Sequence, residues 1–154
     1  MLFRSIEKMI RGEADVVVLA RAGLNRLKTD LSKLFVYPAP PPLLVPAPGQ
    51  GALALQMRAD DDRDISFFHH EVTALCVNQE RRILQALEGG CQLPLGVYIK
   101  PHESGYCMSL FLGNLNSGFE GKAQARMFID LEGETAEVLA DEALTMLLHP
   151  VFKG

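Results

Sequence analysis

In the first sixty residues, the spacing of apolar positions changes every few residues between that of a helix and that of a strand. Helical spacing across Ile6–Ile10 predicts an amphipathic helix that ends at Gly12. The run Asp15–Ala20 is β-branched and apolar on both faces, which predicts an interior strand covered by helices. Further short strands are expected at Leu34–Tyr37 and Ala52–Met57. The first sixty residues are therefore expected to contain a short helix and several short strands.

The second half has a different pattern. Apolar residues recur at helical intervals from Ile65 to Leu87, which predicts a long helix with room for one break. Strand-like segments follow near Gly96–Lys100, Tyr106–Leu115 and Lys122–Asp130, separated by turn signals. A last helix is expected over Glu134–Leu148, before Pro150. This order predicts an α+β domain with a three-stranded antiparallel sheet and helices on one face.

The boundary between these halves is expected at the polar, acidic segment Arg58–Asp64, which we interpret as solvated. The length of the chain by itself predicts one domain. The acidic run lacks the ligand spacing and glycine of a calcium loop, so no metal site is predicted. The proline-rich segment 38–48 is open to two interpretations: a polyproline linker or ligand, or packing through its apolar centre Leu43–Val45.

Composition narrows the function classes. The chain has 154 residues, of which 48% are hydrophobic and 22% charged, as in soluble globular proteins. A net charge of -4 without a basic stripe argues against a nucleic-acid partner, and the apolar runs are too short to cross a membrane. The start of the chain lacks the pattern of a secretory signal, so we expect a cytoplasmic location. Cys76, Cys91 and Cys107 are three thiols without a CxxC pair, which argues against disulfides and zinc.

Two charged pairs invite a catalytic interpretation that we do not adopt. His69 and His70 are adjacent, and neighbours on a helix diverge by about 100°, so the two rings cannot share one metal-binding face. We interpret this pair and Glu71 as helix capping and surface hydrogen bonding. Glu80 and Arg81 are expected to form a structural or surface ion pair.

Cys91 is the strongest candidate for chemistry. It lies in the loop Glu88–Gly96, where two glycines precede it and Pro94 stiffens the exit. A bulky group could therefore be attached to its sulfur. The alternative is an inert small hydrophobic residue, which is the usual role of a lone cysteine. Cys76 and Cys107 lie in apolar periodic segments and are expected to be buried.

Four blocks occur in this order: Gly12–Asp15 with Leu19–Leu27, then Pro46–Leu53, then His69–Ala74 with Glu80–Arg81, then the Cys91 loop. Together they resemble hydroxymethylbilane synthase, also called porphobilinogen deaminase, a family that joins four porphobilinogen units on the path to haem and releases ammonia. The resemblance runs from about Ile6 to the C-terminus and covers the back half of the family's pattern. It implies two domains: residues 1–63 are the end of an incomplete α/β, periplasmic-binding-protein-like domain, and residues 64–154 are the α+β domain that bears the cofactor cysteine.

The resemblance also implies a cofactor and its site. Family members carry a dipyrromethane joined by a thioether to the cysteine that matches Cys91, beside Gly90. The pyrroles carry carboxylates held by arginines, and Arg26 matches one such position. Gln50 and Gly51 match the loop of the cofactor cleft, where the backbone approaches closely.

The chain departs from the family pattern at its N-terminal side, and these departures change the activity that we expect of it. The family's catalytic aspartate lies in an N-terminal domain that does not align with this chain, so we expect no catalytic residue here and no activity in isolation. Arg4 is one place out of register, and Leu2–Ser5 equals the translated end of a common sequencing adapter, so a truncated gene is one explanation and a genuine short gene another. Expected partners are porphobilinogen and the missing N-terminal half, in a full-length monomer. The alternative is a non-catalytic tetrapyrrole-binding or interaction module.

Overall fold

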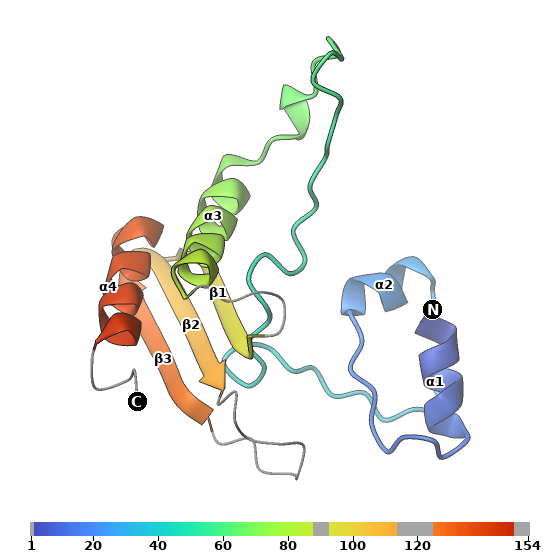
Figure 1. Cartoon of the computed structure of the whole chain (residues 1–154). Coiled ribbons are helices and arrows are strands. Elements are labelled where there is room, and N and C mark those ends of the chain that lie inside the picture. Colours follow the sequence, from blue (N-terminus) through green and yellow to red (C-terminus); the bar gives the residue numbers. More distant parts are fainter. Residues whose placement is uncertain (1, 88–92, 114–124, 150–154) are drawn as a thin grey trace. The chain divides into compact units, whose positions relative to one another are not determined.

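The chain forms two compact units in a computed structural model, residues 1–38 and residues 39–154. Residues 2–87, 93–113 and 125–149 are described (Figure 1). Cys91 and Gly90 therefore lie outside the described residues. Over these ranges the first unit is helical, and the second contains both helices and strands.

The first unit contains two short helices, α1 (Leu2–Ile10) and α2 (Arg21–Arg26). The predicted helix therefore begins earlier than its apolar spacing indicated, and Ile6 is buried. The predicted strand Asp15–Ala20 is not formed: this segment has no regular secondary structure, and the side chains of Val16 and Val18 are 76% and 74% exposed. A strand needs a neighbour for its backbone hydrogen bonds, and the described part of this unit offers none.

The short strands expected at Leu34–Tyr37 and Ala52–Met57 are likewise absent from the described residues. Phe35 and Leu53 are almost fully exposed. Their apolar patterns are those of half-buried strands, but neither segment pairs with a strand of the described residues. A periplasmic-binding-protein-like domain thus stays a prediction.

The second unit contains the α+β domain that the sequence predicts. Its elements are a 3-10 turn η1 (Ser66–Phe68), α3 (Glu71–Ala86), β1 (Leu95–His102), β2 (Gly105–Gly113), β3 (Ala125–Gly133) and α4 (Ala136–Leu148). The three strands form one antiparallel sheet in the order β1-β2-β3. In Figure 1, α3 lies along β1, while α4 lies along β2 and β3.

The core lies between the sheet and these two helices. Across the sheet, Val97 pairs with Leu110 and Leu110 pairs with Ile129, so one row of apolar side chains crosses all three strands. Alternate residues of a strand point to the same face, and this face meets the apolar sides of both helices. Ile83 and Leu139 supply fully buried side chains from α3 and α4. The prediction of helices on one sheet face is confirmed.

Side-chain caps fix where the two long helices begin. His70 is extended, and its ring Nδ1 accepts the Thr73 backbone N–H at 3.2 Å. The single helical pattern from Ile65 to Leu87 is therefore divided at this residue into η1 and α3. Thr135 caps α4 in the same way by accepting the Val138 N–H. The interpretation of His70 as a helix cap is confirmed.

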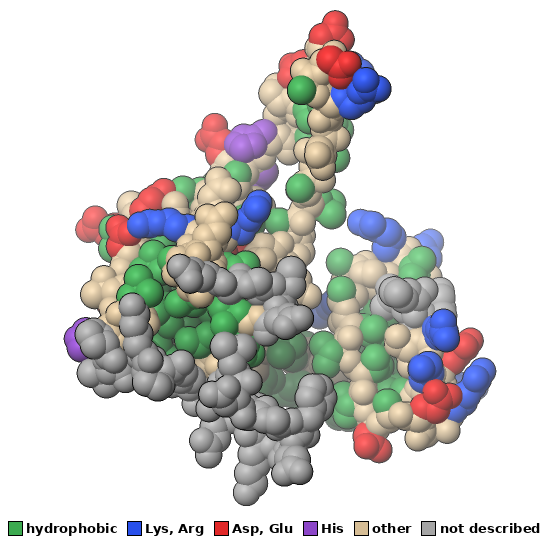
Figure 2. Space-filling view, in the orientation of Figure 1, with side chains coloured by type: hydrophobic (Ala, Val, Ile, Leu, Met, Phe, Trp, Pro, Cys, Tyr) green, Lys and Arg blue, Asp and Glu red, His purple; other side chains and the backbone are tan. Residues whose placement is uncertain are grey.

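The acidic segment 58–64 is an exposed polar tip (Figure 2). Arg58 pairs with Asp60, and Arg63 binds Asp61 through two guanidinium nitrogens. These local ion pairs lower the pKa of Asp61 through the hydrogen bonds from Arg63. Over the described ranges, no group of three or more potential ligands could hold a metal ion. No helix there is long and apolar enough to cross a membrane.

Candidate functional site

The residues predicted for the site are distributed over both units. Arg26 is the exposed last residue of α2, and Gln50 and Gly51 belong to a turn in the second unit. Cys91 and Gly90, between α3 and β1, lie in the range 88–92 that is not described. The described geometry therefore concerns the turn of Gln50 and the elements against which it packs.

The turn around Gln50 is stabilised by hydrogen bonds between its own residues. Its side-chain Oε1 accepts the Ala47 N–H at 3.2 Å, and its own N–H donates to the Ala47 carbonyl at 3.0 Å. Gly49 and Gly51 both have positive φ, +74° and +92°, which glycine adopts without strain. A Cβ added to Gly51 would meet nothing within 4 Å, so the backbone faces open space there. A ligand could approach this backbone closely.

The segment leading into this turn packs against the start of β1. The Val97 N–H donates to the Pro46 carbonyl at 2.9 Å. Val45, the residue before Pro46, lies close to Gly96. A Cβ added to Gly96 would be 2.6 Å from the Val45 carbonyl oxygen. The apolar centre of the proline-rich segment thus contacts the domain at Val45, which favours packing over a free polyproline linker.

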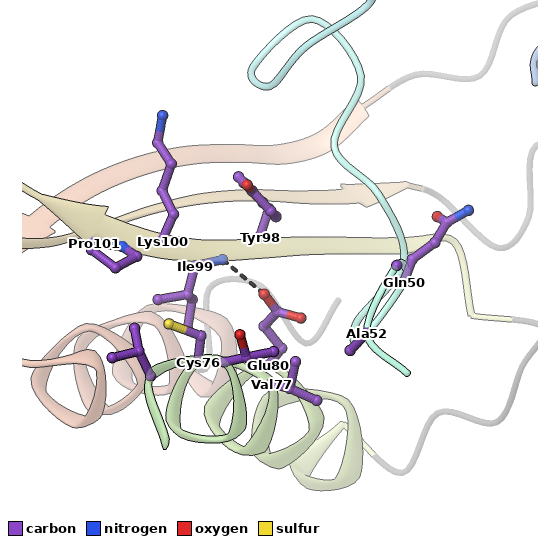
Figure 3. A pocket seen from close by; sticks show the side chains of 12 residues that line it. Gln50, Ala52, Cys76, Val77, Glu80, Tyr98, Ile99, Lys100 and Pro101 are labelled. Carbon is purple, nitrogen blue, oxygen red and sulfur yellow. Dashed lines mark hydrogen bonds between the residues drawn. The ribbon is translucent and has the colours of Figure 1, made fainter. Parts of the chain in front are cut away.

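Glu80 joins this turn to the sheet (Figure 3). Its side chain is 4% exposed, and its two oxygens accept two backbone N–H groups, from Gly49 at 2.7 Å and from Ile99 at 2.8 Å. The ion pair expected between Glu80 and Arg81 is wrong. Glu80 lies on the buried side of α3, whereas Arg81, one residue further round the helix, is exposed.

Sequence reasoning missed Glu80, although a signal was present. Cys76, Glu80 and Ile83 are spaced by four and three residues, so they share one helix face. A carboxylate in the middle of an apolar face needs hydrogen-bond donors, because a buried charge without partners is costly. Burial raises the pKa of the Glu80 carboxyl, and the N–H groups of Ile99 and Gly49 oppose this rise.

A half-open cavity of about 370 Å³ lies between α3, β1 and the turn of Gln50. Figure 3 shows Cys76, Val77 and Ile99 around it, with Tyr98 and Lys100 projecting from the side of β1 away from α3. Its described lining is mixed. Val77 and Ile99 are apolar and Glu80 is hydrogen-bonded, while polar groups come from Gln50, Thr73, Tyr98 and Lys100.

The two described thiols differ in surroundings. Cys76 is 5% exposed, as predicted, and burial raises the pKa of its thiol, with a further rise from the Glu80 carboxylate. Cys107 is only half-buried, so the prediction that it lies in the core is wrong. Cys107 alternates with Met108, which faces the helices, and therefore lies on the sheet face that they leave uncovered.

We expect native thiol labelling to follow this difference. Cys76 should react with a maleimide at least about tenfold more slowly than Cys107, because burial and a raised pKa leave little accessible thiolate. Peptide mass spectrometry after timed labelling measures both rates, and a chain unfolded in guanidinium is the control in which the rates converge. Fast labelling of Cys76 in the folded chain would contradict its placement in the core.

Comparison with known families accounts for both parts of the chain. Residues 3–66 match the model described as "Porphobilinogen deaminase, dipyromethane cofactor binding domain". Residues 74–148 match "Porphobilinogen deaminase, C-terminal domain". Arg26, Gln50 and Gly51 fall within the first match, and Cys91 falls within the second.

Curated relatives with the name porphobilinogen deaminase agree with this result. The protein of Helicobacter hepaticus is 45% identical over 96 residues, covering 60% of this chain and 29% of the relative. The proteins of Chlorobium chlorochromatii and Streptococcus sanguinis are each 33% identical, covering 96% and 92% of this chain and 46% and 45% of the relatives. The chain thus spans less than half the length of these relatives.

A cofactor-binding segment followed by the C-terminal domain is the order in which the two models of one family match this chain. The chain belongs to the porphobilinogen deaminase family, also called hydroxymethylbilane synthase. The cofactor of this family is dipyrromethane, as the description of its cofactor-binding domain states.

Proposed function

We propose that this chain supplies the C-terminal part of an enzyme that polymerises four porphobilinogen molecules to hydroxymethylbilane with release of ammonia. The observation that carries the proposal is the ordered match to the cofactor-binding and C-terminal domains of one family. The remaining length of the relatives would supply the catalytic aspartate, so the chain alone is inactive. The whole enzyme is a cytoplasmic monomer.

Cys91 is the proposed attachment point of the dipyrromethane. Its thiolate is a soft nucleophile that forms a carbon–sulfur bond to the methylene carbon of a pyrrole. In the net reaction with a porphobilinogen unit, the C–N bond of the aminomethyl group breaks and a C–S bond forms, while the thiol proton leaves with ammonia. The attached cofactor supplies the free pyrrole end from which the chain of pyrroles grows.

Arg26, Gln50, Gly51 and Gly90 are the proposed contacts to cofactor and substrate. Two observations fit this role: Arg26 is exposed at the end of α2, and the backbone at Gly51 faces open space. An exposed guanidinium can bind a pyrrole carboxylate through two N–H groups. An open glycine backbone lets a planar ring approach without a clash with a side chain.

A fusion protein tests this function. The part of the Streptococcus sanguinis relative that precedes its match to this chain is joined to the N-terminus of the chain. We expect the fusion to consume porphobilinogen and to carry a covalent dipyrromethane mass, and the unfused chain to do neither, because only the fusion has groups that stabilise cationic pyrroles. Ammonia release and intact-protein mass spectrometry measure the two properties.

Substitutions in the fusion locate the attachment. Cys91→Ser should remove the covalent mass and at least about 99% of turnover, because a serine hydroxyl is a far weaker nucleophile near neutral pH. Cys107→Ser is the matched control and should keep both. Retention of the mass by Cys91→Ser would show that attachment occurs elsewhere. A fusion that folds and binds tetrapyrrole without turnover would favour the non-catalytic module instead.

A further inference from the structure

Glu80 is the one buried charged residue of the described chain, and the chemistry proposed above does not use it. A buried carboxylate loses its hydration, so it persists only where donors replace the water. Both donors of Glu80 are backbone N–H groups from distant parts of the sequence, 31 residues before it at Gly49 and 19 residues after it at Ile99. Each N–H binds a different carboxylate oxygen.

The two anchored segments are those that border the predicted site. Gly49 directly precedes Gln50, so its N–H fixes the turn that faces open space at Gly51. Ile99 lies in β1, the strand that follows the loop of Cys91. Figure 3 shows the Glu80 side chain extending from α3 to Ile99, with the segment of Gln50 beside it. One side chain thus connects the turn, the helix and the strand.

A second group of contacts between these segments lies at Val45 and Pro46, against the start of β1. The Val97 N–H binds the Pro46 carbonyl, and Gly96 leaves room for Val45. These contacts lie three and four residues before Gly49, so they hold the segment that leads into the turn and not the Gly49 amide itself. Among the described hydrogen bonds, the one from Gly49 to Glu80 is the contact that holds the turn to the C-terminal domain.

We propose that Glu80 is a positioning residue, which holds the Gln50 turn at a fixed place on β1 and so aligns the open backbone at Gly51 with that strand. That this alignment matters for catalysis rests on the function proposed above. Glu80 acts through the backbone of Gly49 and Ile99 and touches no reacting atom. A purely structural role would stabilise the whole domain equally, whereas a positioning role acts on the turn first.

Glu80→Gln separates these roles. The amide retains the size of the side chain and its oxygen still accepts one N–H, but its NH2 group faces the other N–H and cannot accept from it. We expect the Gly49 amide of the variant to exchange with D2O roughly tenfold faster than in the unaltered chain, while the Leu110 amide in the sheet changes by less than about threefold. NMR-detected hydrogen exchange on the full chain measures both.

Two further variants sharpen the test. Glu142→Gln makes the same chemical change at an exposed position of α4 and should leave both amides unchanged. Glu80→Asp is one methylene shorter, so it should keep one bond and give an intermediate rate at Gly49, which also tests the proposal if the glutamine variant does not fold. Equal acceleration at Gly49 and Leu110 would overturn the proposal, since it would show a general loss of stability.

The fusion protein adds a functional readout. Glu80→Gln should lower its kcat roughly tenfold and leave KM for porphobilinogen within about twofold, because alignment is lost while the binding groups remain. An unchanged kcat would overturn the role in alignment. The exchange measurement needs no turnover, so it decides whether Glu80 holds the turn even where the proposed function fails.

Discussion

Leu110→Ala is expected to lower the free energy of unfolding by about 3 kcal/mol, a large part of the stability of a small domain. Leu110 is fully buried at the centre of β2, between Val97 of β1 and Ile129 of β3. Its truncation removes apolar contacts and leaves a cavity that fixed strands on both sides cannot close. Urea unfolding followed by circular dichroism measures the change.

Leu53→Ala is the matched control for this prediction. The Leu53 side chain is 92% exposed, so its truncation should change the free energy of unfolding by less than about 0.5 kcal/mol. If both substitutions destabilised the chain equally, Leu53 would have to be buried in solution. The row of apolar side chains across the sheet would then not be the main source of stability.

The sequence predicted the second unit well because its periodic patterns arise from burial within that unit. Met108 and Leu110 alternate with more exposed residues in β2, as a sheet covered on one face requires. Thr135 marks the start of α4 through a local hydrogen bond to Val138. The alternation in β2 reflects which face of one strand is buried, and the cap of α4 is a bond between residues close in sequence. Both signals can therefore be recognised in the sequence before the tertiary structure is known.

The first unit was predicted less well for a physical reason. The apolar run Asp15–Ala20 indicates a segment suited to the interior of a sheet, but a run of residues carries no information about whether a partner strand is present. In the structure this run forms no strand, and Val16 and Val18 are exposed. In the second unit, the segment of Leu53 likewise has the composition of a strand but pairs with no strand of the described residues.

The candidate site was predictable only in its local part. The Cys91 loop and the turn of Gln50 stand out through glycine and proline at short range. Glu80 was misassigned to Arg81, its neighbour in sequence, since its true partners Gly49 and Ile99 are far away along the chain. Buried hydrogen bonds of this kind depend on tertiary structure, and spacing within one helix reveals only that some donor is needed.

Gly96→Ala is expected to lower the free energy of unfolding by about 2 kcal/mol and to weaken the attachment of the segment before Gln50. The new Cβ would lie 2.6 Å from the carbonyl oxygen of Val45 and 3.0 Å from its Cβ, so the backbone of one segment must move. That movement strains the hydrogen bond from Val97 to Pro46. Urea unfolding gives the loss of stability, and hydrogen exchange at the Val97 amide gives the local effect.

Lys100→Ala, an exposed truncation in the same strand, is the control for Gly96→Ala. It should leave the free energy of unfolding within about 0.5 kcal/mol and the Val97 amide protected, because no atom is added between strand and segment. Unchanged stability and unchanged Val97 protection in Gly96→Ala would contradict the close packing of Val45 on β1. Since Val97 and Glu80 hold the same segment at different points, Gly96→Ala should also accelerate exchange at Gly49, although Glu80 itself is intact.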